Sequence, residues 1–145
     1  MSARDPLDAL LRLRRMGVDE ARRALADSLR AGEAASAALE ALEMAIRQET
    51  EAACSLDADD AAVEQFARWL RRVRDRQRGA SAARDAAELA TAQARGLLAA
   101  ARAAVRAIEA MQERQAAILA AAAARTEQAA LDEAGQNAHR RSGDG

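Results

Sequence analysis

The sequence lacks most of the residues that build a thick globular core. It contains no Tyr and no Lys, and Phe, Trp, Pro and Cys occur once each among 145 residues. Alanine is the most abundant residue, and it buries too little apolar area to offset the entropy of ordering many layers of chain. Since Pro is absent from the interior and alanine is the best helix former, the composition favours long helices packed at short range.

Other features that the sequence lacks indicate the cellular compartment. The single Cys54 excludes an internal disulfide and fits a reducing compartment. No segment approaches the ~20 apolar residues of a membrane span, and the N-terminus lacks the pattern of a signal peptide. The net charge of −1 gives no global attraction to nucleic acid or to a membrane surface. We therefore expect a cytoplasmic protein.

The first part of the chain predicts one long helix over residues 6–54. Asp5 is a suitable N-cap and Pro6 suits the first helical position. A spacing of three and four residues then continues without interruption, which is typical of a coiled coil. The residues at this spacing are Leu7, Leu11, Arg14, Val18, Ala21, Leu25, Ser28, Gly32, Ala35, Leu39, Leu42, Ile46, Glu49, Ala53 and Leu56.

Capping residues then cluster at Ser55, Asp57, Asp59 and Asp60, which predicts a turn at about residues 55–59. A second helix is predicted over residues 60–134. A parallel row through Leu70, Leu98, Val105 and Leu119 is also partly apolar. The seam predicted for this helix runs through Phe66, Trp69, Val73, Arg76, Ala80, Ala83, Ala87, Ala90, Ala94, Leu97, Ala101, Ala104, Ile108, Met111, Gln115, Ile118 and Ala122.

Together the two seams predict an all-α fold, an antiparallel two-helix coiled-coil hairpin that forms a single domain over residues 1–134. A turn centred on Asp57–Ala58 would place Leu25 opposite Ala90 and Val18 opposite Leu97, although a heptad repeat fixes the register only modulo seven.

The second helix is expected to be the longer, and to overhang the first from Glu109 to Glu133. Gly135 would serve as its C-cap, with residues 135–145 as a disordered tail. A break at Gly79 would give three helices instead. The continuous helix is favoured, because the apolar period passes this point without a jump in phase.

No pattern in the sequence predicts catalysis. The only His, His139, lies in the expected tail, and Cys54 has no His near it in the sequence. The acidic residues near the turn lack the spacing of a calcium loop, and no Gly-rich phosphate loop is present. A two-helix hairpin also lacks the concavity of an enzyme pocket. We predict a protein without enzymatic activity, metal or cofactor.

One stretch, "EQFARWLRRVRDRQR" at residues 64–78, is a candidate site. Three interpretations are open: a protein-docking patch, plain hairpin packing, or a nucleic-acid contact, which the acidic residues across the turn disfavour. Steps of four, three and four residues predict a half-exposed stripe along one flank of the seam. The stripe consists of Phe66, Leu70, Val73 and Gln77, and the basic patch beside it of Arg68, Arg71, Arg72 and Arg74.

Several segments together resemble a known family. They are "LDALLRLRRMGVDEARRALADSL" near the start, the turn at residues 55–60, "QFARWLRRV" after it, "MQERQ" at residues 111–115 and "ALDEAGQNAHRR" near the end. In this order and spacing they resemble the FliJ-type stalk proteins of flagellar export and their counterparts in virulence type III secretion. The resemblance spans nearly the whole chain.

The resemblance implies a specific set of partners. The end with both termini would insert into the pore of the hexameric export ATPase, using the segment from Glu109 to Glu133. The region after the turn would contact the cytoplasmic part of the membrane export gate, and export chaperones would also bind. The gate contacts of the family fall on Phe66, Leu70, Val73 and Gln77, with Gln77 where the family has His.

Two rival functions are open at this point: a structural or adaptor coiled coil with no ATPase partner, and an Arg-mediated nucleic-acid binder. We expect no nucleic-acid partner, because the acidic residues at 49–64 across the turn would repel phosphate. The resemblance also implies that the protein reaches the membrane only through its partners.

Overall fold

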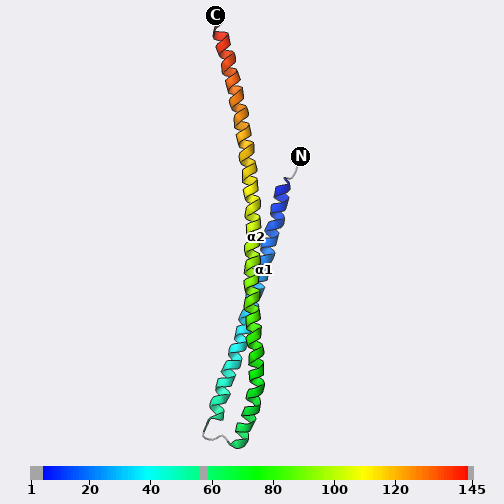
Figure 1. The fold of residues 1–145 in the computed structure, drawn as a ribbon, viewed down its shortest axis with the longest axis vertical. Coiled ribbons are helices and arrows are strands. Elements are labelled where there is room, and N and C mark those ends of the chain that lie inside the picture. Colours follow the sequence, from blue (N-terminus) through cyan, green and yellow to red (C-terminus); the bar gives the residue numbers. More distant parts are fainter. Residues whose placement is uncertain (1–4, 56–58, 144–145) are drawn as a thin grey trace. The chain divides into compact units, whose positions relative to one another are not determined.

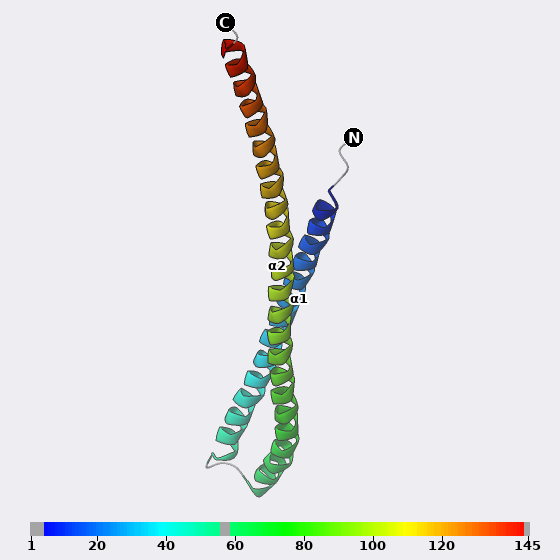
Figure 2. The same cartoon turned by 45° about the horizontal axis from the view of Figure 1, so that its top comes forward.

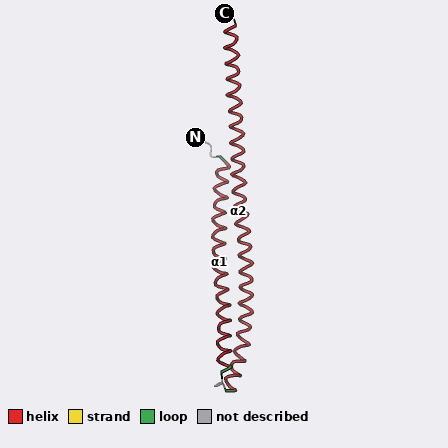
Figure 3. Tube along the Cα trace, turned by 90° about the vertical axis from the view of Figure 1, so that its left-hand side faces the viewer, coloured by secondary structure: helices red, strands yellow, loops and turns green. Residues whose placement is uncertain are grey.

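The computed structural model describes residues 5–55 and 59–143, and these residues form two helices (Figure 1). Helix α1 is Pro6–Ala53 and helix α2 is Asp60–Gly143. Figure 3 shows both as continuous helices, with no strand in the described ranges. The predicted turn centre, Asp57–Ala58, lies outside the described residues.

Both helices begin at side-chain caps. The Leu7 amide donates to Asp5 Oδ1 over 2.9 Å, so Asp5 is the N-cap predicted for the first helix. The Ala62 amide donates to Asp59 Oδ1 over 2.8 Å, which selects Asp59 among the candidate caps of the second. Asp8 and Asp60 lie in the first turns, where the positive end of the helix dipole favours an acidic residue.

The contacts divide the chain into two units, each containing a piece of both helices. One unit joins the chain up to Arg15 with the chain from Arg102 onward, and the other is Met16–Ala101. Within each unit the piece of α1 runs antiparallel to the piece of α2, and the two pieces pack against each other (Figures 1 and 2). The predicted fold class, an antiparallel helical hairpin with a longer second helix, is confirmed. The single domain over residues 1–134 stays a prediction.

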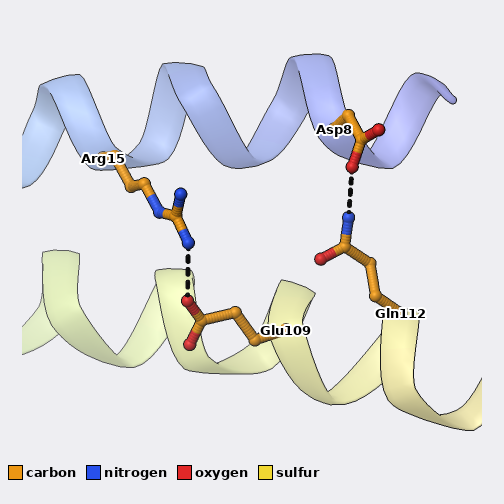
Figure 4. A network of polar contacts seen from close by, with 4 residues as sticks. All are labelled: Asp8, Arg15, Glu109 and Gln112. Atoms are coloured by element: carbon orange, nitrogen blue, oxygen red, sulfur yellow. Dashed lines mark hydrogen bonds and ion pairs between the residues drawn. The ribbon is translucent and has the colours of Figure 1, made fainter. Parts of the chain in front are cut away.

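In the Met16–Ala101 unit the buried side chains come from both helices. They are Val18 and Leu39 of α1, and Val73, Thr91, Ala94 and Leu98 of α2. The other unit buries Leu11 of α1 and Ile108 of α2. Two polar contacts also join α1 to α2 in the unit that contains the start of α1 and the chain from Arg102 onward (Figure 4). Arg15 Nη2 lies 3.1 Å from Glu109 Oε1, and Gln112 Nε2 donates to Asp8 Oδ1 over 2.7 Å.

The seam predicted for the first helix is confirmed. Every described residue of that row is buried or half-buried except Arg14 and Glu49, whose polar side chains are exposed. Leu56, the last member of the row, lies outside the described residues. The row was predictable because large apolar side chains such as Leu11, Val18 and Leu39 recur in it at regular spacing.

The seam predicted for the second helix is half correct. Val73, Ala80, Ala87, Ala94, Ala101 and Ile108 face α1 as predicted, because each is buried or half-buried. Four of the alternate members are wrong by one residue, because Arg76, Ala83, Ala90 and Leu97 are exposed, whereas Trp69 and Ala104 are half-buried as predicted. The places of these four are taken by Gln77, Arg84, Thr91 and Leu98. The members after Ile108 are exposed: Met111, Gln115, Ile118 and Ala122.

Leu70, Leu98 and Val105 of the parallel row are buried or half-buried, so that row forms part of the seam, whereas its last member, Leu119, is exposed. The polar residues Gln77, Arg84 and Thr91 weakened the apolar pattern of this row in the sequence.

The predicted register is wrong by about one helical turn. The Ser28 and Thr91 hydroxyl oxygens lie 3.0 Å apart, which fixes the alignment of the helices at this level. Leu25 lies three residues before Ser28, so the antiparallel partner of Leu25 is Ala94, three residues after Thr91. The prediction had Ala90 there. The other predicted pair, Val18 with Leu97, is also wrong, because Leu97 is exposed.

The end of α2 also differs from the prediction. The helix passes Gly79 without a break, as predicted, but it continues through Gly135 to Gly143. Gly135 is therefore not a C-cap, and its φ is not positive. Residues 135–143, predicted as part of a disordered tail, are helical. Arg140 and Arg141 in the last turn favour this end, because basic residues stabilise the negative end of the helix dipole.

Candidate partner-binding sites

A groove lies where the last turn of α1 meets the first turns of α2. We call it the tip groove; its volume is about 450 Å³. Both aromatic residues of the chain line it, with the Phe66 and Trp69 rings stacked at a centroid distance of 5.8 Å. Both are half-buried. The full lining is Glu49, Ala52, Ala53, Ser55, Ala62, Gln65, Phe66, Trp69 and Arg72.

The small side chains of α1 explain why this groove exists. Ala52 and Ala53 face the aromatic pair, and an alanine fills much less space than the large side chains it faces. Glu49 and Arg72 add an acidic and a basic group from the two different helices. The groove can therefore accept an apolar side chain with polar groups beside it. Reasoning on the second helix alone missed the α1 residues, which only the hairpin pairing could reveal.

The predicted stripe follows the seam and does not lie on its flank. Phe66, Leu70 and Gln77 are half-buried, and Val73 is only 4% exposed. At steps of three and four these residues lead directly into the row that faces α1. The prediction that the stripe lies on the flank was wrong because it was measured from the predicted seam. The observed seam of α2 includes Gln77 in place of Arg76, so the stripe belongs to the seam itself. A role of the stripe in gate binding stays a prediction.

All four members of the predicted basic patch are exposed: Arg68, Arg71, Arg72 and Arg74. None of them forms an ion pair with another residue of the described ranges. The neighbouring Arg78 differs, because it pairs with Asp75 on its own helix. Arg72 alone borders the tip groove, so it can meet a partner that enters the groove.

A second, apolar groove lies beside the start of α1. We call it the terminal groove; it has a volume of about 350 Å³ and is lined by Leu7, Met111, Arg114, Gln115, Ile118 and Leu119. Ile118 and Leu119 are 66% and 64% exposed. Leu7, in the first turn of α1, is the only lining residue from that helix. The apolar side chains of α2 therefore continue past the point where α1 begins. The sequence signal was Ile118 and Leu119 beyond the expected end of the pairing.

After Gln112 the only contribution of α1 to the surroundings of α2 is Leu7 at the terminal groove. Every residue from Glu113 to Gly143 is exposed. The uncovered segment therefore begins slightly later than the predicted overhang, because Glu109 and Gln112 still contact α1. The uncovered segment also ends later than the predicted overhang, at Gly143 and not at Glu133.

Residues 5–55 and 59–143 contain no candidate metal centre. No three His, Cys, Asp or Glu side chains in these ranges come together as a metal site requires. Cys54 is exposed next to the end of α1, and His139 is exposed near the end of α2. No helix in the same ranges is both long and apolar enough to cross a bilayer.

Comparison with protein families decides the relationship. The family model described as "Flagellar FliJ protein" matches residues 2–144. The chain belongs to the FliJ family. The match covers both helices, so the suspected family is confirmed, and with it a relationship to flagellar export. The FliJ family is known as a non-enzymatic export component. No curated protein and no solved structure gave a significant match.

Proposed function

We propose that this FliJ-family chain is a non-catalytic stalk that couples the hexameric export ATPase to the membrane export gate of a type III protein export apparatus. The single observation that carries the proposal is the family match across residues 2–144 of a two-helix hairpin. Export chaperones are proposed as further partners. The chain would act in the cytoplasm and reach the membrane through these partners.

The unit with the chain termini supplies the proposed contact with the ATPase. An ATPase pore lined by apolar side chains could bury Met111, Ile118 and Leu119 of the terminal groove, which water now covers in part. The uncovered helix beyond them could extend further into such a pore. This assignment places the ATPase contact on the part of α2 that α1 leaves free.

The proposed contact with the export gate is the predicted stripe, which begins at Phe66 in the tip groove and continues along α2 outside it. Phe66 and Leu70 are half-buried, so each keeps a surface that a partner could cover. Val73 would support them from the core rather than touch the gate, because it is 4% exposed. Gln77 is half-buried and remains available at the edge of this surface. The exposed arginines would speed the encounter with an acidic partner surface.

The first test is a pull-down of the co-encoded export ATPase, with its hydrolysis rate measured with and without this chain. Binding and faster hydrolysis are expected. The variant Leu119→Glu should weaken both, because it places a charge in the terminal groove. Leu89→Glu is the matched control, since Leu89 is equally exposed, at 61%, and lies outside both grooves. Absence of binding would leave an adaptor coiled coil as the better description.

The second test concerns the gate. The double variant Phe66→Ala and Leu70→Ala should keep its helix content and lose binding to the cytoplasmic part of the gate. Leu89→Ala should bind normally. Unchanged binding by the double variant would remove the gate contact from this surface, while the ATPase result would stand by itself. Retardation of DNA or RNA with steep salt dependence would instead support the nucleic-acid alternative.

A further inference from the structure

The seam of α2 carries polar side chains at three positions spaced seven residues apart: Gln77, Arg84 and Thr91. Thr91 is the best defined of them. It is 8% exposed, its hydroxyl lies 3.0 Å from that of Ser28, and it also lies 3.4 Å from the Ser28 carbonyl oxygen. A buried hydroxyl thus has both of its close partners on the opposite helix.

The middle of the seam does not by itself choose an alignment of the helices. In the other α2 seam position, Val73 begins a row that continues with Ala80, Ala87, Ala94 and Ala101, again seven residues apart. If the helices slid by seven residues, one alanine would replace another along the middle of this row, and only its ends would change the size of the side chain at a given level. Another group in the middle of the seam can therefore help to distinguish alignments that differ by one heptad.

Thr91 makes this distinction. The residues seven positions away from Ser28 on α1 are Ala21 and Ala35, and neither has a side chain that can accept or donate a hydrogen bond. After a slide by one heptad in either direction, the Thr91 hydroxyl would face an alanine. The hydroxyl could still donate to the carbonyl oxygen of that alanine, as it does to Ser28 O in the observed alignment, but the hydrogen bond between the two hydroxyls would be lost, which disfavours the slid alignment. The same slide would place Arg84 or Leu98 opposite Ser28.

We propose that the Ser28–Thr91 pair helps to select one helix register among alignments seven residues apart. A polar residue at a coiled-coil seam is known to specify register at a cost in stability. In this chain we expect the loss of stability at Thr91, because an apolar side chain at this buried position would pack better. The pair therefore acts as a register lock within the Met16–Ala101 unit.

The test uses cysteine pairs as register reporters in a Cys54→Ser background. Leu25→Cys with Ala94→Cys reports the observed alignment, because these positions flank the Ser28–Thr91 pair. Leu25→Cys with Ala87→Cys or with Ala101→Cys reports a slide by one heptad in each direction. A disulfide forms only when the two Cα atoms come within about 7 Å. Intramolecular products are separated from dimers by mass after oxidation at low protein concentration.

With Ser28 and Thr91 in place, only the Leu25–Ala94 reporter should cross-link. After Ser28→Ala and Thr91→Val, the slid reporters should gain about tenfold in yield. Helix content should stay the same, and the thermal midpoint should hold or rise. Thr91→Ser with Ser28 intact retains the hydroxyl and should retain the single register. This variant keeps the test informative even if the double variant folds poorly.

The matched control is Thr126→Val, since the Thr126 hydroxyl is exposed and donates to Ala122 O of its own helix over 3.0 Å. It should leave the cross-linking pattern unchanged. The proposal is overturned if the Ser28 and Thr91 double variant still cross-links only through Ala94. It is equally overturned if Thr91→Ser releases the slid reporters as strongly as the apolar variant does.

Discussion

Leu97 and Leu98 are neighbours in α2 and have the same side chain, yet they lie in opposite environments. Leu97 is 66% exposed, whereas Leu98 is 7% exposed and packs in the seam with α1. We predict that Leu98→Ala destabilises the protein much more than Leu97→Ala does. Each variant is the control for the other, because the chemical change, the helix and the change in helix propensity are the same.

The size of the difference follows from the burial of each side chain. A buried Leu→Ala change typically costs about 2–5 kcal/mol, and the lower part of that range applies here because a two-helix seam is open to water along its sides. Full burial of a leucine contributes about 1.5–3 kcal/mol, so the covered third of Leu97 contributes about 0.5–1 kcal/mol. Alanine's better helix propensity offsets part of this loss. The two variants should differ by about 2 kcal/mol.

Urea unfolding, followed by far-ultraviolet circular dichroism, measures the free energy of unfolding for both variants and the unchanged chain. A large loss for Leu98→Ala and a small one for Leu97→Ala would support the seam described above. Equal losses would mean that neither leucine is at the centre of the seam. A larger loss for Leu97→Ala would return the seam to the row predicted from apolar spacing alone.

Two further predictions concern local features of α1. Asp5→Ala should cost about 0.5–2 kcal/mol by removing the N-cap that accepts from the Leu7 amide. Faster hydrogen exchange at the first-turn amides would reveal it, while Asp5→Ser should restore protection. Gly32→Ala should raise stability by about 0.5–1 kcal/mol, because a Cβ there meets nothing within 4 Å. A lower urea midpoint for this variant would mean that the site is less open than described.

The sequence determined the start of each helix and the seam of α1 well. Asp5, Pro6 and Asp59 are residues with strong positional preferences, and the structure uses them at those positions. Leu11, Val18 and Leu39 follow one spacing that no competing row matches. Local chemistry and one regular pattern were sufficient for these features.

The seam of α2 was less predictable because two rows competed. In one row, Ala83, Ala90 and Leu97 are apolar; in the other, the equivalent positions carry Arg84, Thr91 and Leu98. Preference for apolar side chains selected the first row, although tertiary contacts select the second. A hydrogen bond between Thr91 and a serine on the other helix cannot be foreseen from the spacing within one helix.

The candidate site was predicted in part. The stretch after the turn does contain both aromatic residues and six exposed arginines, among them the four of the predicted basic patch. Its placement relative to the seam was wrong, since that depended on the α2 row. The α1 side of the tip groove, Ala52 and Ala53, was missed because small residues give no signal of their own until the facing aromatic residues are known.

The uncovered segment of α2 has a consequence for the thermodynamics of association. Beyond Leu119 the helix reaches Gly143 with every side chain exposed, and it is alanine-rich over residues 120–124. A partner that surrounds this segment meets a helix whose backbone is already ordered. The entropy loss that accompanies coupled folding and binding is then largely absent at the moment of contact. Binding should therefore show a heat-capacity change set by the buried apolar area alone, without the larger contribution of a folding transition.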